Sequence, residues 1–199
     1  MKKIILILSL IMSVNSYAIN TSPVTVIEIG NFFCGHCYDM ENHIQPIKKY
    51  LDKNGGDFEF APIYYGKFSH YPAQIYMAKL NQLDIVQDQI RKSLFLAANV
   101  LRMHLSSASS TCRIVSEQVK SVSLNYCLQA LEEGRGMSRI ANTEKLVSYL
   151  AKNKYLGEVI EFPVFVIEQD NQIKSVMSAA DTKNMNELAN NVLENIRSL

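Results

Sequence analysis

The sequence has no tryptophan, no repeat and no excess of either charge. Its 199 residues include 20 Lys and Arg against 19 Asp and Glu. Binding to a phosphate backbone needs clustered basic residues, so we expect no nucleic acid among the partners. Cysteine is also scarce. A chain of this length can bury a core without the help of disulfides. The need to stabilise a small fold therefore does not explain its four cysteines, Cys34, Cys37, Cys112 and Cys127.

An apolar run long enough to span a bilayer is absent too. The segment from Ile4 to Met12 is apolar, but it is far shorter than the roughly 20 residues that a spanning helix needs. Lys2 and Lys3 precede it, and Ser16-Tyr17-Ala18 has the small-x-small pattern that signal peptidase reads. We therefore expect residues 1–18 to be a signal peptide, cleaved after Ala18. Without the two lysines, 18 basic residues face 19 acidic ones, a net charge of −1.

The tetrapeptide Cys34-Gly35-His36-Cys37 stands where a strand pattern ends and a helical one begins. The preceding residues, 24–29, are β-branched and almost continuously apolar, as in a strand buried on both faces. Two thiols three positions apart on a first helical turn can form a disulfide and reopen it on another protein. The helix N-terminus and a protonated His36 both favour a thiolate. We assign Cys34 as the nucleophile and Cys37, one turn deeper, as its resolving partner.

The same spacing occurs in structural zinc sites, which normally have a second pair of ligands. Cys112 and Cys127 are the candidates for that pair, but their spacing within helices is poor for zinc. A zinc-stabilised binding module remains an alternative from another functional class. A c-type haem requires histidine directly after the second cysteine, and Tyr38 stands there. We expect no metal and no cofactor.

The remaining pattern predicts strands at 58–65, 162–167 and 173–176, a helical block from 68 to 156, and a closing amphipathic helix that includes 185–196. Three details can be checked. Pro46 falls within the helix expected after Cys37 and should kink it. The stretch 106–110 is expected to be a polar loop, and Asn142-Thr143 is expected to cap a helix.

Cys112 and Cys127 need a separate argument. One unbroken helix would hold them about 22 Å apart, beyond the roughly 7 Å limit for a disulfide. A bridge therefore requires a turn between them, which Ser121 to Asn125 could supply. A structural disulfide and two separate buried thiols both stay open. We expect neither cysteine to be catalytic.

Together these motifs resemble the DsbA family of periplasmic thiol:disulfide oxidoreductases. The resemblance covers essentially the whole chain after residue 18. It implies an α/β thioredoxin fold, residues 19–66 and 157–199, interrupted by an inserted α-helical domain, residues 67–156. It also implies a monomer that introduces disulfide bonds into exported proteins through Cys34 and Cys37. The matching segments are Glu28, Asn31 to Tyr38, Phe162 to Val166, and Asp181 to Met185.

The resemblance assigns three further residues. Pro163 matches the family's cis-proline beside the active disulfide; a strand-initial proline in trans is the alternative. Phe162 would then face the sulfurs and, with Pro163, contact substrate. Glu28 matches a buried acid whose raised pKa would let it move protons to Cys37. Alternatively, Glu28 lies in water at the strand's end. The next strand offers Glu59 and no lysine as its partner. The implied catalytic set is Cys34, Cys37, His36, Pro163 and Glu28.

The implied partners are unfolded or reduced exported proteins as substrates, and a DsbB-like inner-membrane quinone reductase for reoxidation. One dipeptide departs from the family. DsbA proteins commonly carry Pro-His between the cysteines, whereas Gly35-His36 is the pair associated with protein disulfide isomerases. A disulfide isomerase or reductase of the same superfamily is therefore the second reading, and the strength of the oxidant is left open.

Overall fold

The fold is built on a four-stranded sheet with the order β2-β1-β3-β4. The computed structural model describes residues 22–64 and 70–199, so the expected signal peptide, 1–18, lies outside the described residues. Strand β1 (Thr25–Gly30) pairs in parallel with β2 (Asp57–Pro62) and antiparallel with β3 (Val164–Gln169). Strand β4 (Gln172–Ser178) completes the sheet beside β3. The strand that leads into Cys34 is therefore flanked on both sides.

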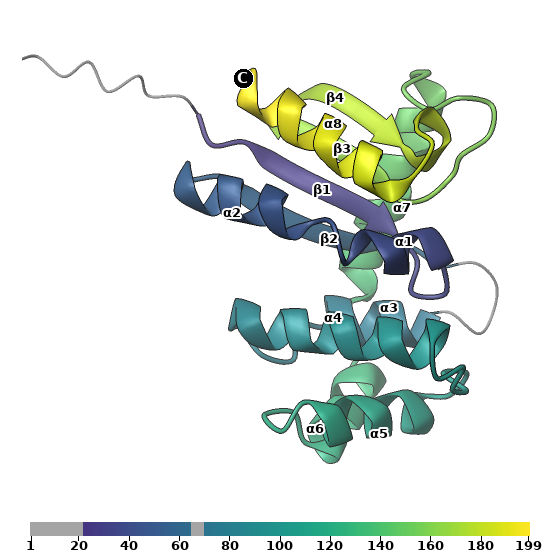
Figure 1. Ribbon diagram of the computed structural model, residues 1–199. Helices are drawn as coiled ribbons and strands as arrows, with labels where there is room; N and C mark the ends of the chain where they lie inside the picture. The colour runs from purple at the N-terminus through teal and green to yellow at the C-terminus, as the bar shows by residue number, and fades with distance from the viewer. Residues whose placement is uncertain (1–21, 65–69) are drawn as a thin grey trace, which may run out of the picture.

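Three helices cover one face of this sheet, as Figure 1 shows. They are α1 (Gly35–Met40), α2 (Gln45–Lys53) and α8 (Met185–Arg197), which follows a short 3-10 turn, Ala179–Asp181. Their apolar residues pack with the sheet residues Val26, Phe165 and Ile167 into one buried cluster. The core on this face fixes α1, and with it the cysteine pair, against β1.

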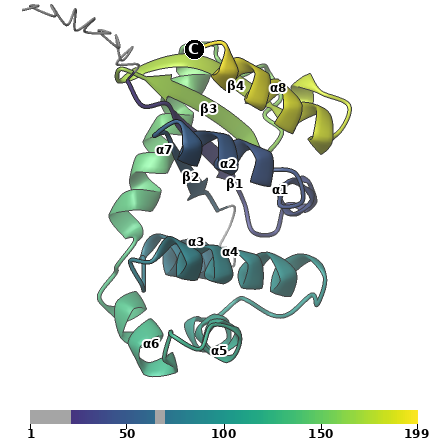
Figure 2. The same ribbon diagram turned by 60° about the vertical axis from the view of Figure 1, so that its left-hand side comes forward.

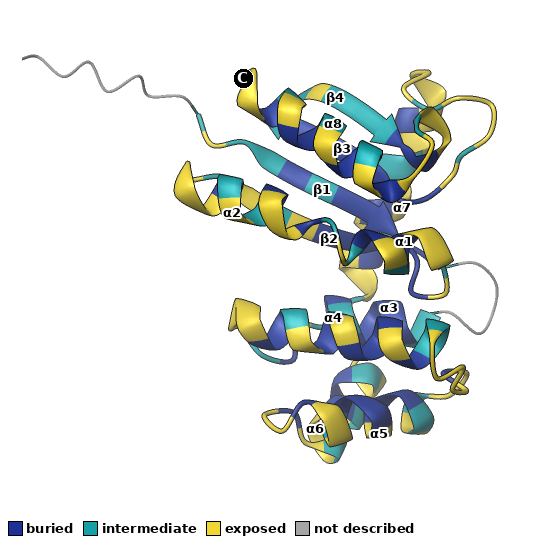
Figure 3. Cartoon of the chain, viewed as in Figure 1, coloured by how far each residue is buried: buried dark blue, intermediate teal, exposed yellow. Residues whose placement is uncertain are grey.

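A block of five helices is inserted between β2 and β3. Helix α7 runs back from this block alongside the sheet, which Figure 2 shows from another side. A second buried cluster includes Ile29 and Phe60 in the sheet and Ile90, Leu94 and Val115 in the block. Figure 3 shows buried segments in both parts. The five are α3 (His70–Met77), α4 (Asp84–Asn99), α5 (Ala108–Gln118), α6 (Leu124–Glu132) and α7 (Met137–Lys152).

The predicted α/β class with a helical insertion is confirmed, and the last two strands, β3 and β4, form a hairpin. Asp170 and Asn171 both adopt positive φ, 57° and 58°, as a two-residue hairpin turn requires. The exact division at residues 66 and 157 stays a prediction, because the core is shared across it. Within the described residues, no helix combines the length and the apolar character needed to cross a membrane.

Three local predictions were wrong. The helix after Cys37 is not one kinked helix: α1 ends at Met40, and Pro46 lies in the first turn of α2, where a backbone N–H has no helical acceptor to lose. The stretch 106–110 is not all loop, because Ser107 caps α5 by accepting from the Ser110 N–H at 3.1 Å. Asn142 and Thr143 lie inside α7, which begins after Gly136.

Candidate active site

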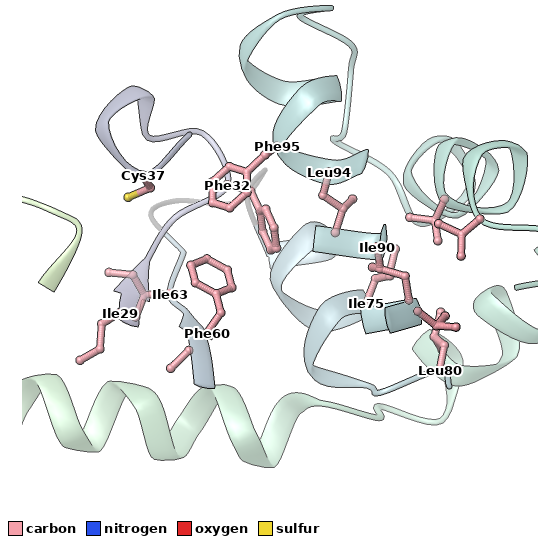
Figure 4. Packing of buried hydrophobic residues seen from close by; sticks show 14 of the residues in the cluster. Ile29, Phe32, Cys37, Phe60, Ile63, Ile75, Leu80, Ile90, Leu94 and Phe95 are labelled. Carbon is pink, nitrogen blue, oxygen red and sulfur yellow. The ribbon is translucent and has the colours of Figure 1, made fainter. Parts of the chain in front are cut away.

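Cys34 and Cys37 lie at the start of α1, and their environments differ. Cys34 is the N-cap residue, partly exposed, and its sulfur accepts the Cys37 backbone N–H at 3.2 Å. Cys37 is completely buried, one turn further along (Figure 4). The two sulfurs are unbonded, so this is the dithiol form of the pair. An incoming thiol can reach Cys34 and cannot reach Cys37.

The same asymmetry appears in acidity. The hydrogen bond from the Cys37 thiol, the Cys37 backbone N–H and the charge of His36 lower the pKa of Cys34 to about 7, against the opposing effect of partial burial. Burial, followed by the hydrogen bond to Cys34, raises the pKa of Cys37 well above its usual range. The sequence argument relied on the helix terminus and His36. In the structure the partner thiol has the largest lowering effect.

Phe162 and Pro163 face the cysteine pair from the start of β3. The Phe162–Pro163 peptide bond is cis. The Cys34 thiol donates to the Phe162 carbonyl at 3.5 Å, although the two residues are far apart in sequence. Both Phe162 and Pro163 are buried. His36, by contrast, is exposed at the surface of α1. Its charge lowers the pKa of Cys34.

An aromatic cluster supports the loop that carries the motif. Phe32, two residues before Cys34, contacts Phe60 of β2 and Phe95 of α4, with ring centroids 5.3 and 4.9 Å apart (Figure 4). The Asn99 side chain also donates to the Phe32 carbonyl at 2.8 Å. Offset and edge-on aromatic contacts of this kind add about 0.5–1.5 kcal/mol each beyond burial. The helical block therefore helps to hold the redox loop in place.

Glu28 of β1 is completely buried, which excludes the reading that it faces water, and it is close enough to interact electrostatically with both Cys34 and Cys37. Its neighbour is Arg91 of α4, with Nη1 3.7 Å from Glu28 Oε2. The other nitrogen of that guanidinium, Nη2, is 2.6 Å from Glu41 Oε1. Burial raises the pKa of Glu28 to about 8 despite the opposing charge of Arg91. At neutral pH the Glu28 carboxyl is therefore mostly protonated.

Sequence reasoning missed Arg91 and Glu41. It searched the neighbouring strand for a cation, but the cation comes from a helix of the inserted block. A weak signal was present, since Gln87, Arg91 and Phe95 follow one another at four-residue spacing along the buried side of α4. Spacing alone cannot tell whether such an arginine faces the core or solvent.

Cys112 and Cys127 form a disulfide that joins α5 to α6, with their Cα atoms 5.7 Å apart. The turn that makes this possible lies between Val119 and Ser123, the N-cap of α6. Because these sulfurs are bonded to each other, they cannot serve as a second thiolate pair for zinc with Cys34 and Cys37. The described ranges also contain no cluster of three or more His, Cys, Asp or Glu arranged to hold a metal.

The chain has the fold of the DsbA proteins. It superposes on a variant of Pseudomonas aeruginosa DsbA with a TM-score of 0.64 and 17% identity, covering 89% of each chain. For the oxidoreductase DsbA of Xylella fastidiosa the TM-score is 0.64 at 15% identity, covering 89% of this chain and 86% of the other. For oxidised BdbD of Bacillus subtilis the TM-score is 0.58 at 16% identity, covering 89% of this chain and 90% of the other. No family model and no curated protein matches the sequence.

Proposed function

We propose that this protein is a periplasmic thiol:disulfide oxidoreductase that introduces disulfide bonds into exported proteins through Cys34 and Cys37. The observation that carries the proposal is the asymmetry of the pair. One sulfur is reachable and has a pKa of about 7, and the other is buried with a pKa well above the usual range. Stabilising the Cys34 thiolate favours the dithiol form, and that makes the disulfide more oxidising than one formed from unperturbed thiols.

The oxidation proceeds in two exchanges. A substrate thiolate attacks Cys34 Sγ of the Cys34–Cys37 disulfide, the bond between the two enzyme sulfurs breaks, and a mixed disulfide with Cys34 forms. A second substrate thiolate then attacks the substrate sulfur of that mixed disulfide. The substrate disulfide forms and Cys34 leaves as a thiolate. The substrate loses two electrons and the enzyme ends as the dithiol found in the structure.

Glu28 supplies a proton in the first exchange. Cys37 leaves as a thiolate in a buried place where a negative charge is costly. Glu28 interacts electrostatically with Cys37 and is itself mostly protonated at neutral pH. Transfer of its proton to Cys37 leaves a neutral thiol and a carboxylate that interacts with Arg91. The proton later returns to Glu28 when Cys37 is oxidised again.

Phe162 and Pro163 form the surface on which a substrate segment is aligned. The Phe162 carbonyl already accepts the Cys34 thiol, so this backbone lies directly against the reacting sulfur. A client cysteine joined to Cys34 would place its own backbone beside the same segment. Residues 1–18 direct export of the chain. A DsbB-like inner-membrane quinone reductase then reoxidises the dithiol.

The proposal is tested by mixing the oxidised, purified chain with an equimolar reduced peptide that carries two cysteines. We expect stoichiometric peptide disulfide and equivalent loss of the Cys34–Cys37 bond, read by alkylation gel shift because the chain lacks tryptophan. C34A should abolish the reaction, and C37A should trap a mixed disulfide after activation. C112A/C127A is the matched control and should retain full activity. Oxidation that survives in C34A would overturn the proposal.

A further inference from the structure

Three ionisable side chains from three separate elements meet near the cysteine pair. Glu28 belongs to β1, Glu41 follows α1, and Arg91 comes from α4 of the helical block. Their exposed side-chain fractions are 0%, 9% and 1%, so water stabilises none of them well. One buried cation therefore has to serve two buried acids.

The guanidinium of Arg91 lies closer to Glu41 than to Glu28. Arg91 Nη2 is 2.6 Å from Glu41 Oε1, whereas Nη1 is 3.7 Å from Glu28 Oε2, beyond hydrogen-bond distance. In the described part of the chain, none of the carboxylate oxygens of Glu28 and Glu41 accepts a hydrogen bond of good geometry, and Arg91 Nη2 donates none. The difference between the two acids is therefore the distance of each from the guanidinium. The guanidinium also lies over the rings of Phe58 and Phe60, 5.4 and 5.1 Å from their centroids. These contacts hold it against Glu41 and leave Glu28 without a close donor.

We propose that Glu41 and Arg91 are positioning residues that set the proton affinity of Glu28. Glu41 engages the guanidinium and keeps it from pairing closely with Glu28, which leaves Glu28 protonated and able to donate. Arg91 remains near enough to stabilise the Glu28 carboxylate once its proton has left. The consequence for Cys37 rests on the proposed function; the control of Glu28 by its two neighbours does not. The helical block thereby supplies a charged group to the redox site.

Other charged or titratable groups also surround Glu28 and do not remove this arrangement. Lys48 of α2 acts in the same direction as Arg91, but its Nζ is bound to Asp88 Oδ1 at 2.6 Å. Cys34 opposes ionisation of Glu28, as Glu41 does. Burial raises the pKa values of Cys37 of α1 and Tyr76 of α3, and Glu28, when it is ionised, adds to both shifts.

The test is a direct titration of Glu28 by carbon-13 NMR of its carboxyl carbon, assigned with E28Q and recorded on the oxidised full chain. E41Q should lower the titration midpoint by at least one pH unit, because the freed guanidinium can then pair with Glu28. R91M should raise the midpoint by a similar amount, and R91K should fall between R91M and wild type. Opposite shifts from two neighbours are not expected of groups that merely hold the fold together.

E133Q is the matched control. It breaks another Arg–Glu pair of similar length, Arg135 Nε to Glu133 Oε2 at 2.7 Å, but at the exposed C-terminal end of α6. It should leave the Glu28 midpoint unchanged. If R91M does not fold, E41Q still decides, since it keeps the size of the side chain. An unchanged midpoint in a folded E41Q protein overturns the inference whatever the oxidase activity.

The link to Cys37 has its own readout. The rate of disulfide reduction by a small thiol, corrected for its thiolate concentration, should fall above the Glu28 midpoint and should do so at lower pH in E41Q. If the midpoint moves in the titration and the rate profile does not follow, the proton step of the proposed function is wrong and the control of Glu28 by Glu41 and Arg91 stands.

Discussion

Cys34 and Cys37 carry the same side chain, yet their surroundings give them opposite acidities. The sulfur of Cys34 accepts hydrogen bonds from Cys37, and the sulfur of Cys37 is buried beneath it. The sequence predicted which of the two is the more exposed, because spacing and helix position place Cys34 nearer the surface. It could not predict that the partner thiol contributes most to the lowered pKa.

Alkylation of reduced protein by iodoacetamide should therefore show a half-maximal rate near pH 7, where Cys34 is half ionised. A free thiol reaches that point near pH 8.5. H36A should move the midpoint upward, because the histidine charge lowers the pKa of Cys34. The C112A/C127A protein should keep the wild-type midpoint. A midpoint above 8 in wild type would contradict the assignment of Cys34 as an activated nucleophile.

Glu28 gives a prediction for stability against pH. Its pKa is raised in the folded state from 4.5 to about 8, so between these values the folded chain binds more protons than the unfolded chain. Protonated Glu28 therefore contributes fully to the free energy of unfolding below about pH 4.5. This contribution is lost as pH rises through about 8, at up to about 1.4 kcal/mol per pH unit. Urea unfolding should show this fall in wild type and a flatter profile in E28Q. If the stability of E28Q falls with pH as that of wild type does, Glu28 is not the group responsible.

The disulfide between Cys112 and Cys127 joins two short helices of the block. It closes a loop of 15 residues, for which chain entropy predicts a stabilisation of about 3 kcal/mol. C112A/C127A should lose about that much free energy of unfolding in urea while keeping the Cys34–Cys37 chemistry. Sequence left this bridge open, because only the turn before Ser123 decides whether the two sulfurs meet. Unchanged stability would show that the bridge has no structural role.

Helix α7 begins where α3 leaves no room for a side chain. Gly136 has φ +86°, and a Cβ there would lie 2.6 Å from the Gln74 carbonyl oxygen and 2.7 Å from the Ala78 nitrogen. G136A should cost about 3 kcal/mol or more, from strain plus overlap. G134A is the control, since Gly134 also has positive φ, +67°, but open space around it. It should cost about 1–2 kcal/mol. If G136A and G134A lose the same stability in thermal unfolding, overlap of the added Cβ atom with α3 has no part in the cost.

Helix boundaries were the least predictable feature of the elements. Apolar spacing gives a helix its face but not its first residue, which depends on caps and breaks. Pro46 was read as a kink because the apolar pattern runs through it, but the chain already breaks at Glu41–Ile44. Strands were easier, because their β-branched runs are local, and Asp170-Asn171 between two of them adopts the positive φ angles of a two-residue hairpin turn.

Across the whole molecule, local patterns predicted the α/β class, the inserted helices and the cysteine pair. Contacts between distant segments were not predictable from one sequence. Arg91 reaches Glu28 from the helical block, and Phe162 reaches Cys34 from the start of β3. The resemblance to a family supplied the second contact through Pro163. It supplied nothing for the first, because this chain takes its buried cation from α4 and not from the neighbouring strand.

The reduction potential of the Cys34–Cys37 pair decides whether the chain is an oxidant. It is measured by equilibrating the protein with graded mixtures of reduced and oxidised glutathione and counting alkylated thiols by gel shift. The proposed oxidation of exported proteins requires a potential well above that of thioredoxin, so we expect a value between about −200 and −120 mV. A value near about −270 mV would make the pair a reductant in character and would contradict the proposed oxidation of exported proteins.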